Sequence, residues 1–180
     1  QLIRETCGIP TDMFGQDADS LITDGQSMIE GMCNTLLPAL AGANILSGAG
    51  GLGHDNTADP VKLVIDDEIL GMTYRMLRGF EINDDTLGLD ALARVGPDGN
   101  FLTDKHTLKY FKTEYFRPHI FNWQMRGKWQ SEGKRDLNEN AKQRAKTILR
   151  EHKPSPLPED VVKELDSIIK MAEKTYTLKK

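Results

Sequence analysis

Apolar residues recur at helical spacing in two long stretches of the chain. In the first stretch, the apolar positions are Met28, Ile29, Met32, Cys33, Leu36, Leu37 and Leu40. In the second stretch, they are Val61, Val64, Ile65, Ile69, Met72, Met76 and Leu77. Each set falls on one face of a helix, so both stretches are predicted to be amphipathic helices. Pro38 should bend or end the first helix, while Asp59, Pro60 and Gly79 are typical of the start and the left-handed end of the second.

Two short apolar runs flank the first helix. The extended run at residues 8–15 lies between turn-forming residues, and Ile45-Leu46 follows a turn at residues 39–42. An order of strand, helix and strand favours a right-handed parallel unit, so we expect Met13-Phe14 and Ile45-Leu46 to be neighbouring parallel strands. The polar residues between the first strand and the helix offer three N-cap candidates, which are Asp17, Asp19 and Ser20.

Beyond Gly79 the pattern predicts shorter elements and then a wholly helical end. A helix is expected from Asp84 or Asp85 to Val95, followed by a turn at residues 97–100. Phe101-Leu102 is short enough to be a last strand or only a loop. The remaining helices are expected at residues 104–116, 137–149 and 161–172, with a stiff proline-rich linker at residues 153–158.

The run Gly48-Ala49-Gly50-Gly51-Leu52-Gly53 fits the spacing G-x-G-x-x-G. In a dinucleotide-binding fold, such glycines open a helix at once, so that its N–H groups meet a pyrophosphate. Here residues 54–59 intervene before the helix predicted from Pro60, which disfavours a nucleotide-binding oxidoreductase fragment but leaves it as an alternative. The pattern favours a strand that opens into a glycine loop carrying polar groups, as in an α/β barrel.

Composition restricts the class of protein. The 180 residues carry 23 Lys and Arg against 27 Asp and Glu, and the net charge of -4 does not favour nucleic acid. Cys7 and Cys33 form no C-x-x-C motif, and no cluster of His, Cys and carboxylates has zinc-like spacing, so no metal site is expected. Because no disulfide framework is indicated, a reducing cytoplasm is the default expectation. No apolar run approaches the roughly 18 residues that span a bilayer, so no membrane contact is expected. The start at Gln1, within what reads as the end of a helix, suggests a piece of a longer protein.

Five segments, taken in order, carry a resemblance to a known family. They are Ile45–Leu52, Leu63–Leu70, Val95–Leu102, His106-Thr107 and Arg117-Pro118. Together they resemble the C-terminal part of the trimethylamine methyltransferase family. Its members are (β/α)8 barrels that move a methyl group from a methylated amine to the Co(I) corrinoid of a small partner protein.

The resemblance implies an α/β fold, with the last β/α units of a (β/α)8 TIM barrel at residues 1–116 and a C-terminal helical extension at residues 117–180. Such units cannot close a barrel alone, so activity would belong to the complete protein. The resemblance also implies a corrinoid (cobalamin) that is carried by the partner protein and is not bound covalently in this chain. Assembly into a homo-oligomer is expected as well.

Gln16 and Asp17 stand where the trimethylamine-specific members of the family carry pyrrolysine. The resemblance therefore implies a member without pyrrolysine, which demethylates a quaternary amine such as glycine betaine, carnitine or proline betaine. Its quaternary nitrogen already carries a positive charge and leaves as a neutral amine after in-line attack by Co(I), so the protein mainly supplies position and electrostatic surroundings. A noncatalytic interaction domain is the remaining alternative, supported only by the aromatic and charged C-terminal half.

His54 is the candidate catalytic residue. At the end of the glycine loop of a barrel it would face the mouth, where it binds the substrate carboxylate or meets the corrinoid. A loop histidine hydrogen-bonded to the backbone is the alternative. Gly48, Gly50 and Gly51 are candidates for binding the substrate or the corrinoid, because they either allow a bulky ligand close to the backbone or satisfy positive φ.

Further binding candidates lie beyond the loop. Asn100 and Phe101 are placed at the next predicted strand end, where Phe101 can face a quaternary ammonium by cation–π attraction or lie in the core. His106, on a predicted helix, is a candidate for the same site, although a structural histidine is the better interpretation. Asp66-Asp67-Glu68 is interpreted as a solvated or inter-subunit helix face, because three adjacent positions spread around a helix.

Overall fold

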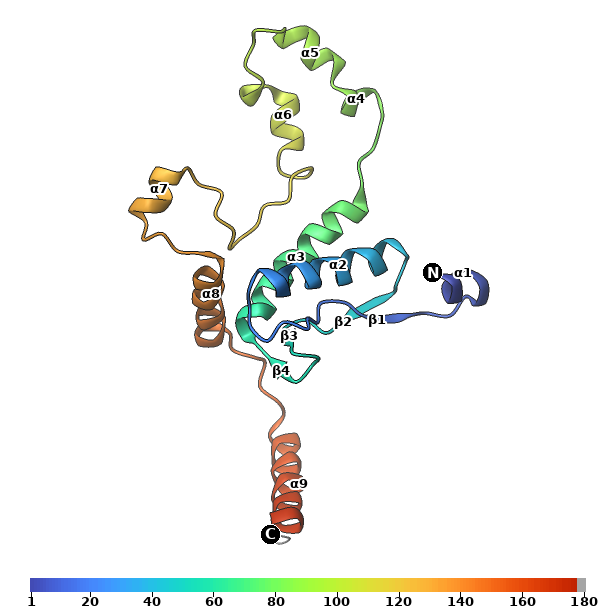
Figure 1. Cartoon of the computed structure of the whole chain (residues 1–180), viewed down its shortest axis with the longest axis vertical. Coiled ribbons are helices and arrows are strands. Elements are labelled where there is room, and N and C mark those ends of the chain that lie inside the picture. The colour runs from blue at the N-terminus through green and yellow to red at the C-terminus, as the bar shows by residue number, and fades with distance from the viewer. Residues whose placement is uncertain (178–180) are drawn as a thin grey trace. The chain divides into compact units, whose positions relative to one another are not determined.

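The computed structural model describes residues 1–177, and of Thr177 only the backbone. Residues 1–147 form one compact unit, and the residues from Ile148 onward form a second. The described chain is mostly helical, with a few short strands between the first helices (Figure 1). The division into barrel units at residues 1–116 and a helical extension at residues 117–180 stays a prediction, and the last three residues of that extension lie outside the described part.

A parallel strand pair joined by a helix forms the N-terminal part of the first unit. Strands β1 (Asp12–Phe14) and β2 (Ile45–Ser47) pair in parallel, with Met13 opposite Leu46. Helix α2 (Gly25–Leu40) connects them, and it packs against helix α3 (Figure 1). The predicted unit of strand, helix and strand is therefore confirmed.

The N-terminus of α2 is capped later in the chain than predicted. Asp24 is the N-cap, and its carboxylate accepts from the N–H of Ser27 at 3.1 Å while the Ser27 hydroxyl accepts from the N–H of Asp24 at 3.0 Å. Such a reciprocal box satisfies two helix-end donors at once. Ser20, one of the predicted caps, instead donates its hydroxyl to Asp24 at 3.0 Å. Pro38 lies in the last turn, and α2 ends two residues beyond it.

A β-hairpin begins within the glycine run at residues 48–53, where the pattern predicted only a loop. Strands β3 (Gly51–Leu52) and β4 (Thr57–Ala58) pair antiparallel, and Ala18 forms an isolated parallel bridge to Leu52. Ala18 and Leu52 are both buried. The base of the hairpin is thus fixed against the segment that follows β1.

Helix α3 (Pro60–Arg78) confirms the second long helix. Asp59 is its N-cap and accepts from the N–H of Val61 at 2.8 Å, while Pro60 occupies the first turn. Gly79 ends the helix with φ +62°, as expected for a glycine cap, but its ψ of −148° lies outside the predicted left-handed helical region. No helix begins at Gly50; the glycine run instead contains strand β3 of the hairpin, and α3 starts only after the hairpin.

The hydrophobic core lies between α2, α3 and helix α8 (Leu137–Glu151). Its buried members are Ile65, Ile69, Ile120 and Ala141. Met28 and Met32 of α2 and Leu137 of α8 pack against this cluster. Burying an isoleucine side chain is worth about 1.5–3 kcal/mol, so the apolar stripe of α3 stabilises the part of the chain that carries the glycine loop.

Glycine divides the third predicted helix in two. The helix expected up to Val95 consists of α4 (Asp84–Leu87) and α5 (Leu89–Val95). Gly88 between them is left-handed, with φ +65°. A left-handed residue ends one helix and starts another because the hydrogen-bond ladder cannot pass through it.

The segment after α5 departs most from the predicted pattern. Phe101 and Leu102 form neither a strand nor a loop but a short 3-10 helix, η1 (Phe101–Thr103). The predicted helix at residues 104–116 ends early, as α6 (Lys105–Tyr110), and helix α7 (Arg126–Ser131) was not predicted. A strand at Phe101 was therefore wrong, because Asn100 caps the 3-10 turn and draws the chain into a helical conformation.

Apolar side chains on the strand pair are exposed. Met13, Phe14 and Ile45 are 47%, 58% and 59% exposed. Helix α1 (Leu2–Cys7) precedes the pair. In the second unit, helix α9 (Glu159–Thr177) confirms the last predicted helix, and the apolar residues of its stripe are exposed as well.

Candidate functional site

Two loops leave the parallel strands at the same edge. Residues 15–20 follow β1, and residues 48–55 follow β2. Hydrogen bonds hold the starts of the two loops next to each other: the carbonyl oxygen of Ser47 accepts from the N–H of Gly15 at 2.7 Å and from that of Gln16 at 3.3 Å. The carboxyl ends of parallel strands are where α/β folds place their ligands. We refer to these two segments as the loop site.

The glycine loop owes its shape to the conformation of its glycines. Gly48 and Gly50 have φ +91° and +81°, and the N–H of Gly51 donates to the carbonyl of Gly48 at 3.1 Å. A β-carbon on Gly48 would also lie 3.1 Å from the ring of Phe14. Positive φ and a close approach within the chain therefore account for Gly48, and positive φ accounts for Gly50.

Gly51 leaves room for two carboxylates. Its φ is not left-handed, yet an added β-carbon would lie 2.5 Å from Asp17 Oδ1 and 2.8 Å from Asp55 Oδ1. Asp17 comes from the loop after β1, and Asp55 comes from the turn between β3 and β4. The two distances show that both side chains converge on the same glycine. Asp17 Oδ1 is buried and has no hydrogen-bond partner among the described residues.

The neighbouring carboxylate of Asp17 affects the ionisation of Asp55. The pKa of Asp55 is raised from its ordinary value of 3.8, first by loss of hydration and then by the negative charge of Asp17. Two like charges held together disfavour ionisation of both, and a proton or a cation between them relieves the repulsion. The sequence singled out Asp17 as an N-cap candidate and through the resemblance, and it gave no reason to pair Asp17 with Asp55.

His54 lies beside this pair and bonds to a carboxylate. Its Nδ1 is 2.7 Å from Asp19 Oδ1, and both side chains are 72% exposed. His54 and Asp55 are consecutive left-handed residues, with φ +56° and +62°. Asn56 supports that turn by donating its side-chain amide to the carbonyl of Gly53 at 2.9 Å. The backbone-bonded loop histidine considered above is therefore not what the structure contains.

Gln16 points away from the loop site into the protein. Its side chain is buried and donates to the carbonyl of Asp66 at 2.8 Å. Lys62 Nζ donates to the carbonyl of Gln16 at 2.5 Å. Of Gln16 and Asp17, only Asp17 contributes its side chain to the loop site.

The acidic run of α3 is buried where we expected a solvated face. Asp66 and Glu68 are almost fully buried, while Asp67 is exposed. Asp66 Oδ2 pairs with Lys62 at 2.7 Å and accepts from the N–H of Gly50 at 2.7 Å. Burial raises the pKa of the Asp66 carboxyl most, and the bonds from Lys62 and Gly50 lower it.

Glu68 holds a different segment against α3. Its Oε1 accepts from the N–H of His119 at 2.6 Å and from that of Ile120 at 3.1 Å. Interpreting the run as an exposed face was wrong because these acids accept from backbone groups far away in the sequence. A signal was present in the sequence: Lys62 and Asp66 lie four residues apart, interleaved with the apolar stripe of Ile65 and Ile69.

Asn100, Phe101 and His106 bond within their own segment. Asn100 accepts from the N–H of Leu102 at 2.9 Å and caps η1, and Phe101 is 37% exposed. His106 Nε2 lies 2.6 Å from the carbonyl of Asp85, which is the structural role considered for it. None of the hydrogen bonds described for these three residues reaches the loop site.

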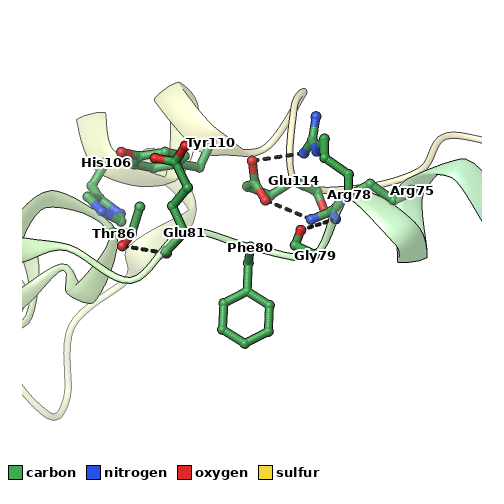
Figure 2. Close-up of a pocket in the computed structure, with 9 residues that line it drawn as sticks. All are labelled: Arg75, Arg78, Gly79, Phe80, Glu81, Thr86, His106, Tyr110 and Glu114. Carbon is green, nitrogen blue, oxygen red and sulfur yellow. Dashed lines mark hydrogen bonds and ion pairs between the residues drawn. The ribbon is translucent and has the colours of Figure 1, made fainter. Parts of the chain in front are cut away.

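His106 also borders a hollow of about 610 Å³ (Figure 2). The two arginines that line this hollow, Arg75 and Arg78, are already paired, because they lie 2.6 and 2.9 Å from the carboxylate oxygens of Glu114. Arg75 additionally donates to the carbonyl of Gly79 at 2.7 Å. These bonds fasten the end of α3 to the turn after α6, which favours a structural role for the hollow.

No group of three or more His, Cys, Asp or Glu side chains at residues 1–177 is placed to hold a metal ion. No helix in the described part of the chain is long and apolar enough to cross a membrane.

Comparison with known proteins gives consistent matches. The model of the family described as trimethylamine methyltransferase (MTTB) matches residues 1–176. Trimethylamine methyltransferase MttB of Methanosarcina barkeri is 32% identical over 170 residues, which cover 94% of this chain and 34% of that protein. The glycine betaine methyltransferase of Desulfitobacterium hafniense is 31% identical over 163 residues, which cover 90% of this chain and 34% of that protein. The chain thus spans about a third of the length of the curated relatives it matches.

Proposed function

Because the chain belongs to the trimethylamine methyltransferase family, we propose that it is the C-terminal third of an enzyme that demethylates a quaternary amine such as glycine betaine. The acceptor is the Co(I) corrinoid of a partner protein, which supplies the nucleophile. In the complete protein, β1 and β2 are two strands of a TIM barrel, and the loop site lies at its mouth. Both relatives described above carry methyltransferase names, which supports the reaction class.

The convergence of Asp17 and Asp55 beside His54 carries the proposal. A quaternary ammonium has a permanent positive charge but no N–H, so it is recognised by charge and by aromatic faces and not by hydrogen bonds. The carboxylates of Asp17 and Asp55 supply negative charge on one side of Gly51. The half-exposed ring of Phe14 lies close to Gly48 and supplies an aromatic face, one of the two roles considered for Phe101.

His54 binds the other end of a betaine. Asp19 occupies its Nδ1, which orients the ring and leaves Nε2 to donate to a substrate carboxylate when both ring nitrogens are protonated. The ammonium and the carboxylate of glycine betaine are separated by one methylene group. Asp55 contributes to the site for the ammonium, and the adjacent His54 donates a hydrogen bond to the carboxylate, which matches the short distance between the two charges of the molecule.

The residues of this chain act by binding and orientation. The positive charge of the amine disappears as the methyl group leaves, so negative side chains stabilise the bound substrate more than the transition state. Asp17 and Asp55 therefore contribute to affinity, and the rate comes from holding the C–N bond in line with the acceptor. The amine leaves uncharged and needs no proton from the protein.

The loop site also suits an acceptor brought by another protein. The side chains of His54 and Asp19 are both largely exposed, so a bulky group can approach them from solvent. Contacts of Gly48, Gly50, Gly51, Asn100, Phe101 and His106 with substrate or corrinoid, and homo-oligomerisation, stay predictions.

A panel of methyl donors tests the proposal. The complete protein is mixed with free cob(I)alamin, and the loss of its absorbance is followed with glycine betaine, carnitine or trimethylamine. We expect the quaternary amines to be consumed and trimethylamine to be inert, since Gln16 and Asp17 stand where pyrrolysine is needed. Turnover of trimethylamine alone contradicts the substrate class, and no transfer from any donor favours the noncatalytic alternative.

A further inference from the structure

A buried ion pair of α3 lies next to both loops of the site. Lys62 Nζ is 2.7 Å from Asp66 Oδ2, and neither side chain has exposed surface. Removing two charges from water is costly, and their attraction offsets that cost only when the remaining polar atoms are also bonded. The other partners of this pair therefore matter for what it does.

Each member of the pair holds the backbone beside one carboxylate of the loop site. Lys62 Nζ donates to the carbonyl of Gln16, the residue before Asp17, at 2.5 Å. Asp66 Oδ2 accepts from the N–H of Gly50 at 2.7 Å. Gly50 directly precedes Gly51, against which Asp17 and Asp55 converge. The pair thus connects the loop after β1 to the loop after β2 through a single helix.

We propose that Lys62 and Asp66 are positioning residues that set the separation of the Asp17 and Asp55 carboxylates by tying both loops to α3. They touch no substrate and act through the peptides of Gln16 and Gly50. The inference rests on the proposed function, because it takes the two aspartates as the amine-binding groups. Gln16 adds a third tie from its own side chain, which donates to the carbonyl of Asp66 at 2.8 Å.

The decisive variant removes the tie without leaving a buried charge. Lys62→Met alone leaves the Asp66 carboxylate uncompensated and can prevent folding. The double variant Lys62→Met/Asp66→Leu is apolar at both positions and removes both the ammonium that bonds to Gln16 and the acceptor of the Gly50 N–H. Thr73→Val is the matched control, because Thr73 lies on the same helix, is 2% exposed and touches neither loop through a hydrogen bond.

Two measurements on the complete protein report the effect of the double variant. Hydrogen exchange followed by mass spectrometry reports on residues 15–21 and 47–56, where loss of the tie should speed exchange by on the order of tenfold. Steady-state kinetics with glycine betaine and cob(I)alamin should show a fall in kcat/KM on the order of 10- to 100-fold, since misplacement by about 1 Å has such effects. The control should change neither quantity.

The two measurements separate the inference from the proposed function. Unchanged exchange in both loops of the folded double variant overturns the tie. Faster exchange with unchanged kcat/KM overturns the positioning role. If the wild-type protein transfers no methyl group, the proposed function fails, and faster exchange in the double variant still supports Lys62 and Asp66 as the tie between the loops.

Discussion

Replacing Gly51 with alanine places a methyl group between the two carboxylates of the loop site. That carbon would lie 2.5 Å from Asp17 Oδ1 and 2.8 Å from Asp55 Oδ1. Because ordinary contacts begin at 3.4 Å, the two oxygens must retreat by about 0.9 Å and 0.6 Å. The φ of Gly51 is not left-handed, so its backbone conformation accepts alanine. The methyl group would also lie 3.0 Å from the carbonyl oxygen of Gly48, which must shift by about 0.4 Å, less than either carboxylate oxygen. The substitution therefore moves the carboxylate pair more than the loop.

The expected loss follows from those displacements. A shift approaching 1 Å costs up to about 100-fold in rate, so kcat/KM for glycine betaine should fall on the order of 10- to 100-fold, mainly through a higher KM. Overpacking should cost about 1–3 kcal/mol of stability. The cob(I)alamin assay measures the first quantity and denaturant unfolding of the complete protein measures the second.

Gly127→Ala is the matched control for Gly51→Ala. Its β-carbon would have no atom within 4 Å, and the φ of Gly127 is not left-handed. Within α7, alanine in place of glycine should stabilise the helix by about 0.5–1 kcal/mol and leave the kinetics unchanged. A folded Gly51→Ala protein with wild-type KM and kcat would refute the reasoning, because the carboxylate pair would then have no part in binding.

Three further predictions follow from single side chains. Lys62→Met should destabilise the complete protein by about 3–5 kcal/mol at neutral pH. Burial raises the pKa of the Asp66 carboxyl above its ordinary value of 3.8, so the ionised form destabilises the fold at neutral pH. The loss of unfolding free energy in Lys62→Met should therefore shrink as the pH falls towards 3.8. Equal losses in unfolding experiments at neutral and acidic pH would contradict this. His54→Ala should raise KM for glycine betaine but not for tetramethylammonium, which has no carboxylate, and equal effects on both donors would argue against carboxylate binding. The pKa of Asp24 is lowered by the Ser27 N–H and then by the Ser20 hydroxyl, so its cap stabilises fully above 3.8 and is lost below. Asp24→Ala should therefore lower the unfolding midpoint at neutral pH and by less in acid, and a pH-independent loss would contradict that account.

Local signals in the sequence were sufficient for the main elements. The spacing of apolar residues predicted helices α2 and α3. Pro60 and Gly79 marked the start and the end of α3. The order of elements then predicted the parallel pair β1–β2. The hairpin β3–β4 was missed because its two-residue strands have no pattern of their own and depend on the bridge from Ala18 to Leu52.

The candidate site was only partly readable for the same reason. His54 and Asp17 follow strand ends and could be selected from the sequence, but Asp55 joins them only through two left-handed residues in the loop. Lys62 and Asp66 are interleaved with the apolar stripe of α3, but their spacing of four residues is also that of an ordinary helix-surface pair. Their burial is decided by Gln16 and Gly50, whose positions relative to α3 follow from the tertiary fold.

Calorimetric binding of glycine betaine to the complete protein tests most directly whether the carboxylate pair is the amine site. The double variant Asp17→Asn/Asp55→Asn removes both charges at nearly constant volume, and Asp67→Asn removes one exposed charge from α3 as a control. We predict that the double variant weakens binding by on the order of tenfold or more, while Asp67→Asn binds like the wild type. Unchanged affinity in a folded double variant would contradict the account.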